Sequence, residues 1–78
     1  MELMRVSGTN IHAIGYEEDS ASMQIQFTNG DVYAYQNIEP DTYAAMLNGD
    51  PGRYFASIIK PQRYKYIFTK LGNMPLVP

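Results

Sequence analysis

The chain has 78 residues, which allow one domain, and its lack of cysteine excludes disulfides and thiolate metal sites. The single histidine, His12, cannot hold a metal ion by itself. A core this small is only marginally stable, and self-association is the remaining way to stabilise it, so we predict a homo-oligomer. A net charge of -2 argues against a general nucleic-acid binder, which would be expected to be basic.

Alternating apolar and polar residues predict an antiparallel sheet in the first half of the chain. Residues 11–18 alternate imperfectly, which predicts a strand bent or bulged at Gly15. Residues 23–28 alternate cleanly and indicate a half-buried strand. Asn29 and Gly30 are a strong hairpin signal because both tolerate a positive φ, and residues 32–38 follow as the return strand.

The length of this hairpin loop decides where Tyr33 and Tyr35 point. With the two-residue loop that Asn-Gly favours, both rings share the polar face of Gln26 and could form a platform on which a planar base stacks. A loop longer by one residue would instead place them beside Ile25 in the core, with their hydroxyls at its rim. We favour the shorter loop, and we leave platform and core as alternatives.

Two short helices are expected next. Residues 40–49 predict a helix with proline in its first turn. Its inner stripe would consist of Tyr43, Met46 and Leu47. Residues 53–60 predict a second helix, which ends before Pro61.

The C-terminal stretch completes the predicted sheet. Residues 63–71 alternate and predict a final strand, and residues 72–78 predict an extended tail with prolines. The order β-β-β-α-α-β predicts an α+β fold, in which two short helices cover a small antiparallel sheet made of a three-stranded meander and the C-terminal strand. Residues 1–71 would form a single domain.

The sequence carries no sign of a membrane span or a secretion signal. No apolar run reaches the roughly 18 residues that a bilayer requires. The N-terminal residues lack the basic-then-apolar pattern of a signal peptide. We therefore predict a cytoplasmic protein that does not interact with membranes.

The charges are distributed unevenly along the chain. Residues 1–50 hold all eight acids and one base, for a net charge of -7, and residues 51–78 hold five bases and no acid, for a net charge of +5. Such an asymmetry points to an anionic partner for the C-terminal part. The alternative is that the two halves neutralise each other across the fold.

Arg53 and Tyr54 open the second predicted helix. A helix N-terminus offers free backbone N–H groups to a phosphate or carboxylate, and the arginine side chain could bind the same anion through two hydrogen bonds. The alternative is that Arg53 pairs with a nearby acid such as Asp50.

A second group of basic residues alternates with aromatic ones. Lys60, Arg63 and Lys65 interleave with Tyr64 and Tyr66. On a strand, Arg63 and Lys65 would share one face and the tyrosines the other, so a ligand would meet both kinds of side chain only at an edge or between subunits. The alternative is an edge strand that its charges protect from aggregation.

An ordered series of short features runs from about residue 6 to residue 60. It consists of Gly15 and Tyr16, Phe27, Gly30, Tyr33 and Tyr35, Tyr43, Gly52 to Phe55, and Ile59 and Lys60. In this order the features resemble the KTSC domain, a small module found at the C-terminus of some bacterial lysyl-tRNA synthetases and as a stand-alone protein. RNA binding has been suggested for the family, so the resemblance implies a fold and a binding class rather than a reaction.

The residues give little support to catalysis. No cysteine is present, and His12 has no serine and aspartate pattern that would make a triad recognisable. The consecutive acids Glu17, Glu18 and Asp19 fall in a predicted turn, which favours a solvated loop over a metal site. We predict no enzymatic activity, no cofactor and no metal.

The leading hypothesis is a non-catalytic module that binds a nucleotide or a short nucleic acid as a homo-oligomer. One interpretation is the sequestration of a nucleotide signal, as small phage-encoded proteins do. The alternatives are an RNA-binding accessory domain and a protein–protein interaction module. The predicted ligand-binding residues are Tyr33, Tyr35, Arg53, Tyr54, Lys60, Arg63, Tyr64 and Lys65.

Overall fold

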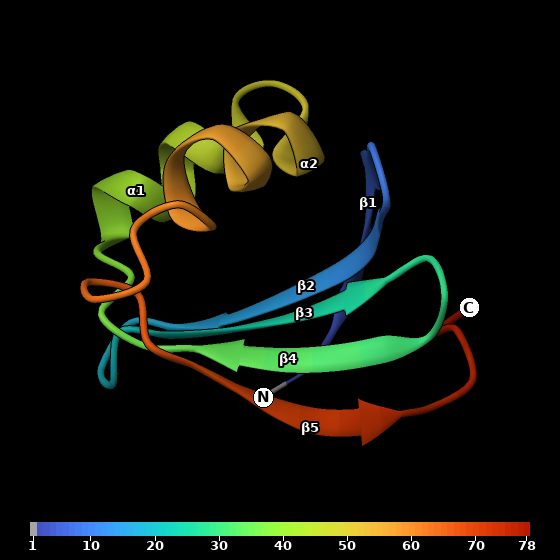
Figure 1. Ribbon diagram of the computed structural model, residues 1–78. Coiled ribbons are helices and arrows are strands. Elements are labelled where there is room, and N and C mark those ends of the chain that lie inside the picture. The colour runs from blue at the N-terminus through green and yellow to red at the C-terminus, as the bar shows by residue number, and fades with distance from the viewer. Residues whose placement is uncertain (1) are drawn as a thin grey trace.

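The computed structural model describes residues 2–78, and within them one antiparallel sheet is covered by helices on one side (Figure 1). The strands are β1 (Met4–Gly8), β2 (Ile11–Glu17), β3 (Ser22–Phe27), β4 (Asp31–Tyr35) and β5 (Phe68–Asn73), and they lie side by side in chain order. Between β4 and β5 the chain forms α1 (Pro40–Leu47), α2 (Pro51–Tyr54) and a π-helical segment, η1 (Phe55–Ile59). The predicted α+β class is confirmed.

Two strands differ from the prediction. The sequence pattern does not predict β1, which carries no clean alternation and pairs with β2 at one edge of the sheet. The last strand begins at Phe68 rather than at residue 63, because the chain first turns back on itself: the Tyr66 amide donates to the Gln62 carbonyl at 2.9 Å. It then continues to Asn73, so the tail predicted for residues 72–78 starts only after that residue.

The loop between β3 and β4 is one residue longer than the favoured prediction. Tyr33 pairs with Ile25, the Gly30 amide donates to the Phe27 carbonyl at 2.9 Å, and Gly30 has a φ of 94°. A three-residue loop that ends with glycine at positive φ is the next commonest hairpin form after the two-residue loop. The predicted register is therefore wrong, and Tyr33 and Tyr35 lie on the helix-facing side of the sheet with Ile25.

The core lies between this face and the helices. Met46 of α1 is fully buried, and the half-buried ring of Tyr43 stacks on Tyr16 with a centroid distance of 4.3 Å. Leu47, predicted to face inward, is 41 % exposed. Adjacent helix residues point about 100° apart, so a helix this short turns only Tyr43 and Met46 toward the sheet.

The opposite face of the sheet is crossed by the C-terminal tail. The side-chain amide of Gln26, which is fully buried, donates to the carbonyls of Met74 and Pro75 at 3.1 Å each, and its oxygen accepts from the Val77 amide at 3.1 Å. The His12 Nε2–H donates to the Val77 carbonyl at 2.6 Å. Because Gln26 is satisfied in this way, a buried polar side chain is compatible with a stable sheet.

The turn between β1 and β2 is joined directly to the start of α2. Asp50 accepts hydrogen bonds from the amide and the hydroxyl of Thr9 at 2.8 and 2.7 Å. A Cβ on Gly52 would lie 1.7 Å from the Thr9 carbonyl oxygen, so the two backbones touch at a position where only glycine fits. This contact fixes α2 beside β1 (Figure 1).

Candidate functional site

Aromatic rings gather on the helix-facing side of β4 and β5. They come from β3, β4, β5 and the start of η1, and they are Phe27, Tyr33, Tyr35, Phe55 and Phe68. Ring centroids of neighbouring pairs lie 5.3 to 6.4 Å apart, mostly edge-to-face or tilted. These distances are typical of favourable aromatic packing, so the rings hold one another in place.

Along β4 and β5 the facing residues change from aromatic to polar. The cross-strand pairs are Tyr35 with Phe68, Tyr33 with Lys70, and Asp31 with Asn73. Residues two apart on a strand share a face, so all three β4 side chains point to the helix side. The Lys70 ammonium lies 6.0 Å from the Tyr33 ring centroid and 3.6 Å from Asp31 Oδ2.

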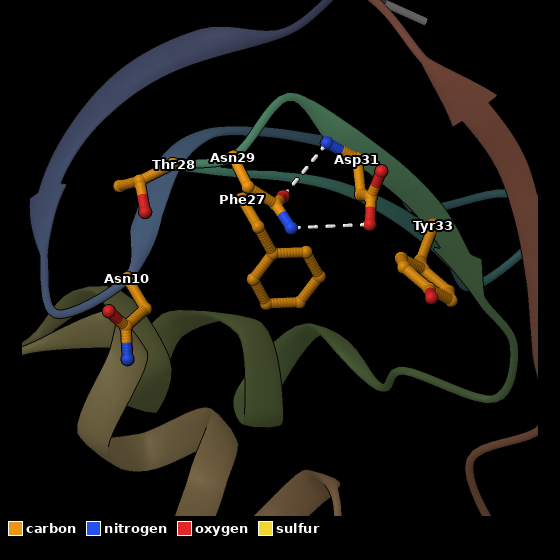
Figure 2. A pocket seen from close by; sticks show the side chains of 6 residues that line it. All are labelled: Asn10, Phe27, Thr28, Asn29, Asp31 and Tyr33. Carbon is orange, nitrogen blue, oxygen red and sulfur yellow. Dashed lines mark hydrogen bonds between the residues drawn. The ribbon is translucent and has the colours of Figure 1, made fainter.

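Two adjoining pockets open along this stretch. The first, the aromatic pocket, has a volume of about 250 Å³ and is lined by Phe27, Tyr33, Tyr35, Phe55, Lys60 and Phe68. The second, the rim pocket, has a volume of about 430 Å³ and is lined by Asn10, Phe27, Thr28, Asn29, Asp31 and Tyr33 (Figure 2). Phe27 and Tyr33 line both, and we call the two adjoining pockets together the aromatic groove.

The Tyr35 hydroxyl stays protonated in this setting. Burial raises the pKa of Tyr35 to about 12, with the neighbouring Tyr33 as a smaller cause. The ring is only 7 % exposed, and its hydroxyl makes no hydrogen bond to another of the residues 2–78. None of these residues has a fully buried side-chain polar atom without a partner, so the hydroxyl oxygen must be accessible to solvent. It is therefore available as a hydrogen-bond donor at the aromatic pocket.

Lys60 supplies the cation of the aromatic pocket. It follows η1 directly, is exposed, and has no ion-pair partner among the residues that the structure describes. Lys65 and Lys70, in contrast, lie 3.6 Å from the carboxylates of Glu39 and Asp31. The aromatic pocket thus combines apolar walls with an unneutralised positive charge.

Asp31 is held as a carboxylate at the rim pocket. Its oxygens accept from the side-chain amides of Asn73 at 3.0 Å and Asn29 at 3.3 Å (the second bond is drawn in Figure 2). The Asn73 hydrogen bond, followed by the charge of Lys70, holds the pKa of Asp31 below its usual value. The rim pocket therefore carries a negative charge that is partly balanced by its neighbours.

Arg53 and Tyr54 lie in a different place. They line a pocket of about 380 Å³ between α1 and the α2–η1 segment, away from the aromatic groove. The expectation of a free helix N-terminus is wrong, because Asp50 Oδ1 already accepts from the Gly52 and Arg53 amides at 2.9 and 3.3 Å. An external anion would have to displace this carboxylate to reach the backbone amides. Arg53 could therefore bind an anion only through its side chain.

We expect Asp50 to make the domain sensitive to acid. The hydroxyl and amide of Thr9, with smaller contributions from the Arg53 and Gly52 amides, lower the pKa of Asp50 to about 2 from its ordinary 3.8. A lowered folded-state pKa stabilises the fold above the ordinary value, and this contribution is lost as the pH falls from about 4 toward about 2.

The measurement is thermal unfolding of the wild type and Asp50→Asn between pH 7 and pH 2. At pH 7 the variant should unfold roughly 4–8 °C lower, because it loses the Oδ2 acceptor of the Thr9 hydroxyl and the charge that strengthens the other hydrogen bonds. The difference should shrink steadily below pH 4. A difference that stays constant down to pH 2 would contradict the assignment.

The remaining predicted residues lie in the turns between η1 and β5, not on a strand. The predicted strand face shared by Arg63 and Lys65 is therefore wrong. Tyr64, between them, is 100 % exposed, and the Lys65 ammonium lies 5.3 Å from the ring centroid of the buried Tyr66. Of the eight predicted residues, the structure brings three together in the aromatic pocket, namely Tyr33, Tyr35 and Lys60.

Sequence reasoning missed the groove residues that look like ordinary core or turn residues. Phe27 and Phe55 carry the apolar pattern of a core, and Asn10 and Asp31 carry that of turns. With the longer loop, strand alternation alone would have placed Phe27 beside Tyr33. Residues 2–78 contain no group of three potential metal ligands and no helix long and apolar enough to cross a bilayer.

The fold and the site define a small α+β domain with an aromatic groove at one end of its sheet. The chain belongs to the KTSC domain family, whose sequence profile matches residues 7–64, so the predicted resemblance is confirmed. It is 28 % identical over 67 residues to an uncharacterized protein of Stutzerimonas stutzeri (strain A1501), covering 85 % of this chain and 94 % of that protein. A crystal structure of a KTSC domain protein from Yersinia pestis superposes with a TM-score of 0.81 at 26 % identity, covering 91 % of this chain and 97 % of the other.

Proposed function

We propose that this domain is a non-catalytic module that binds a nucleotide or the end of a short nucleic acid in its aromatic groove. The observation that carries the proposal is the aromatic pocket, in which aromatic walls adjoin the side chain of Lys60, a lysine without an ion-pair partner among the described residues. Stacking of a base on aromatic side chains contributes about 1–3 kcal/mol, and an ammonium at the pocket mouth attracts the attached phosphate.

The size of the pocket favours a discrete ligand over a long strand. Its volume of about 250 Å³ is below the roughly 300–1,000 Å³ typical of pockets for drug-sized molecules, so it suits a single ring system. The chain also has a net charge of -2, which supports a local contact with one phosphate rather than a track along many.

The groups in the aromatic pocket are suited to holding a ligand rather than transforming it. Its walls are hydrocarbon rings, phenol groups and one ammonium, and the Tyr35 phenol remains protonated at neutral pH. We therefore keep sequestration of a nucleotide signal, in the cytoplasm, as the proposed biological role.

Lys60→Gln is expected to weaken nucleotide binding about fivefold to tenfold at low salt. It removes the cation beside the aromatic walls while keeping a side chain of similar length. Isothermal titration calorimetry with the four ribonucleoside 5′-monophosphates measures the effect. Lys65→Gln is the matched control, because it makes the same change in net charge at a residue already paired with Glu39.

The control should bind within twofold of the wild type. If both variants lose the same affinity for the nucleotide, the nucleotide is attracted by the overall positive charge of the C-terminal part and not by the aromatic pocket. If the wild type gives no binding signal at millimolar nucleotide, the proposal itself is contradicted.

A second candidate function is RNA binding through the turn that precedes β5. It is favoured by one observation, the complete exposure of Tyr64 between two cationic residues, Arg63 and Lys65. Such a ring can stack on an unpaired base while its neighbours contact phosphates. In that case Tyr64→Ala, rather than Lys60→Gln, would weaken binding to a single-stranded RNA, with a steep dependence on salt.

We also propose that the domain self-associates through β5. Within residues 2–78 this strand is paired on one side only, with β4. Apolar side chains that are 43 to 55 % exposed gather on and around it, and they are Ile67, Phe68, Leu71, Met74 and Leu76. An open strand edge with apolar neighbours is a common pairing surface.

Sedimentation velocity at micromolar concentration should therefore detect particles larger than the 8.9 kDa monomer. Leu71→Lys, which adds a charge on the open strand, should shift the population toward monomer without unfolding it. A wild type that sediments only as a monomer at these concentrations would remove this part of the proposal.

A further inference from the structure

The two ends of the aromatic groove carry opposite charges. Lys60, without an ion-pair partner among the described residues, lines the aromatic pocket, and the Asp31 carboxylate lines the rim pocket. The Lys70 ammonium, 6.0 Å from the Tyr33 ring centroid, lies 3.6 Å from Asp31 and balances only part of the charge of that carboxylate. A ligand with one anionic group should therefore point that group to Lys60 and away from Asp31.

The rim pocket is built to meet hydrogen-bond donors. Figure 2 shows Asp31 and Tyr33 on one side of it, Asn10 and Thr28 on the other, and the Phe27 ring between them. A carboxylate offers about four acceptor positions. The Asp31 oxygens use positions for Asn73, Asn29 and Lys70, which leaves capacity for one more donor.

We propose that the rim pocket is a ribose subsite, in which Asp31 accepts a hydrogen bond from the 2′- or 3′-hydroxyl of a nucleotide whose base occupies the aromatic pocket with its phosphate toward Lys60. The inference rests on the proposed nucleotide binding and deepens it, because it names ribonucleotides as the ligand class. Carboxylates accept hydrogen bonds from ribose hydroxyls in the same way at dinucleotide sites of unrelated folds. A deoxyribose offers one donor fewer to the same carboxylate.

Distances along the strand support this division of the groove. Asp31 and Tyr33 are neighbours on the same face of β4, and residues so related lie about 7 Å apart along a strand. The sugar of a nucleotide is directly bonded to its base. A base packed on Tyr33 and Phe27 thus brings its ribose to the Asp31 end without any change in the protein.

The test compares each of the four ribonucleoside 5′-monophosphates with its 2′-deoxy and 3′-deoxy counterparts by calorimetry. The wild type should bind the best ribonucleotide about tenfold more tightly than at least one deoxy form, as expected for loss of a hydrogen bond to a charged group. Asp31→Asn should lose this preference and keep the affinity for the deoxy form. Lys70→Gln, which leaves the carboxylate in place, should keep the preference.

The outcomes separate this inference from the function it rests on. Equal binding of ribo and deoxy forms by the wild type would overturn the ribose subsite and leave nucleotide binding intact, whereas no binding of any form would overturn both. If Asp31→Asn fails to fold, the wild type still decides the question. In nuclear magnetic resonance spectra of the wild type, the chemical shift of the Asp31 carboxyl carbon should change when the ribonucleotide is added and not when the weaker deoxy form is added. An unchanged chemical shift with the ribonucleotide would overturn the inference.

Discussion

Replacing Gly52 by alanine should strongly destabilise the protein. In an ordinary helix this change stabilises by up to about 1 kcal/mol. Here the added Cβ would lie 1.7 Å from the Thr9 carbonyl oxygen and 2.6 Å from its carbon, which no side-chain rotation can relieve because both atoms belong to the backbone. We expect a loss of about 3 kcal/mol or more, since α2 would have to move away from β1.

Urea unfolding followed by circular dichroism measures this loss, and Gly49→Ala is the matched control. A Cβ on Gly49 would meet nothing within 4 Å, so that variant should stay within about 1 kcal/mol of the wild type. A Gly52→Ala protein as stable as Gly49→Ala would show that the contact with Thr9 is not needed.

The second large effect is expected for Tyr35→Ala. The ring of Tyr35 is 7 % exposed and packs edge-on against Phe55 with a centroid distance of 5.3 Å. Truncation of a buried aromatic residue costs about 3–5 kcal/mol. A domain of this length is expected to have a total stability of only about 4–12 kcal/mol, so the variant should lose a large part of it and unfold at a clearly lower temperature than the wild type.

Tyr35→Phe separates packing from hydrogen bonding at this position. It keeps the ring and removes only a hydroxyl that has no partner among the described residues, so its stability should stay close to that of the wild type. Thermal unfolding of both variants provides the measurement. A Tyr35→Ala protein as stable as Tyr35→Phe would mean that the ring is a surface platform, as the shorter hairpin loop would have required.

How far the sequence could predict the fold depended on how local the deciding interactions are. The alternation of residues 23–28 and the glycine of the hairpin define β3 and β4, and the proline at the start of α1 marks that helix. The loop length is a different matter. Loops of two and three residues are both compatible with Asn29 and Gly30, and one residue reverses the face of every side chain of β4.

The site could be predicted only in part for the same reason. Lys60 and the two tyrosines of β4 stand out as charged and aromatic residues, and they do line one pocket. Asp31 stands out only once the cross-strand pairs are known, because nothing in its local sequence indicates that it meets Lys70. The N-terminus of α2 was misjudged because its occupant, Asp50, is held there by Thr9, 41 residues earlier in the chain.

The most direct test of nucleotide binding in the aromatic groove is a nitrogen–proton correlation spectrum of the labelled protein during titration with ribonucleoside 5′-monophosphates. Binding in the groove should shift the backbone signals of Tyr33 in β4, Lys60 directly after η1 and Phe68 in β5, which all line the aromatic pocket. Signals of Arg53, in the separate pocket beside α1, should stay in place. Shifts confined to Arg53 or to the turn around Tyr64, or no shifts at millimolar nucleotide, would contradict the account.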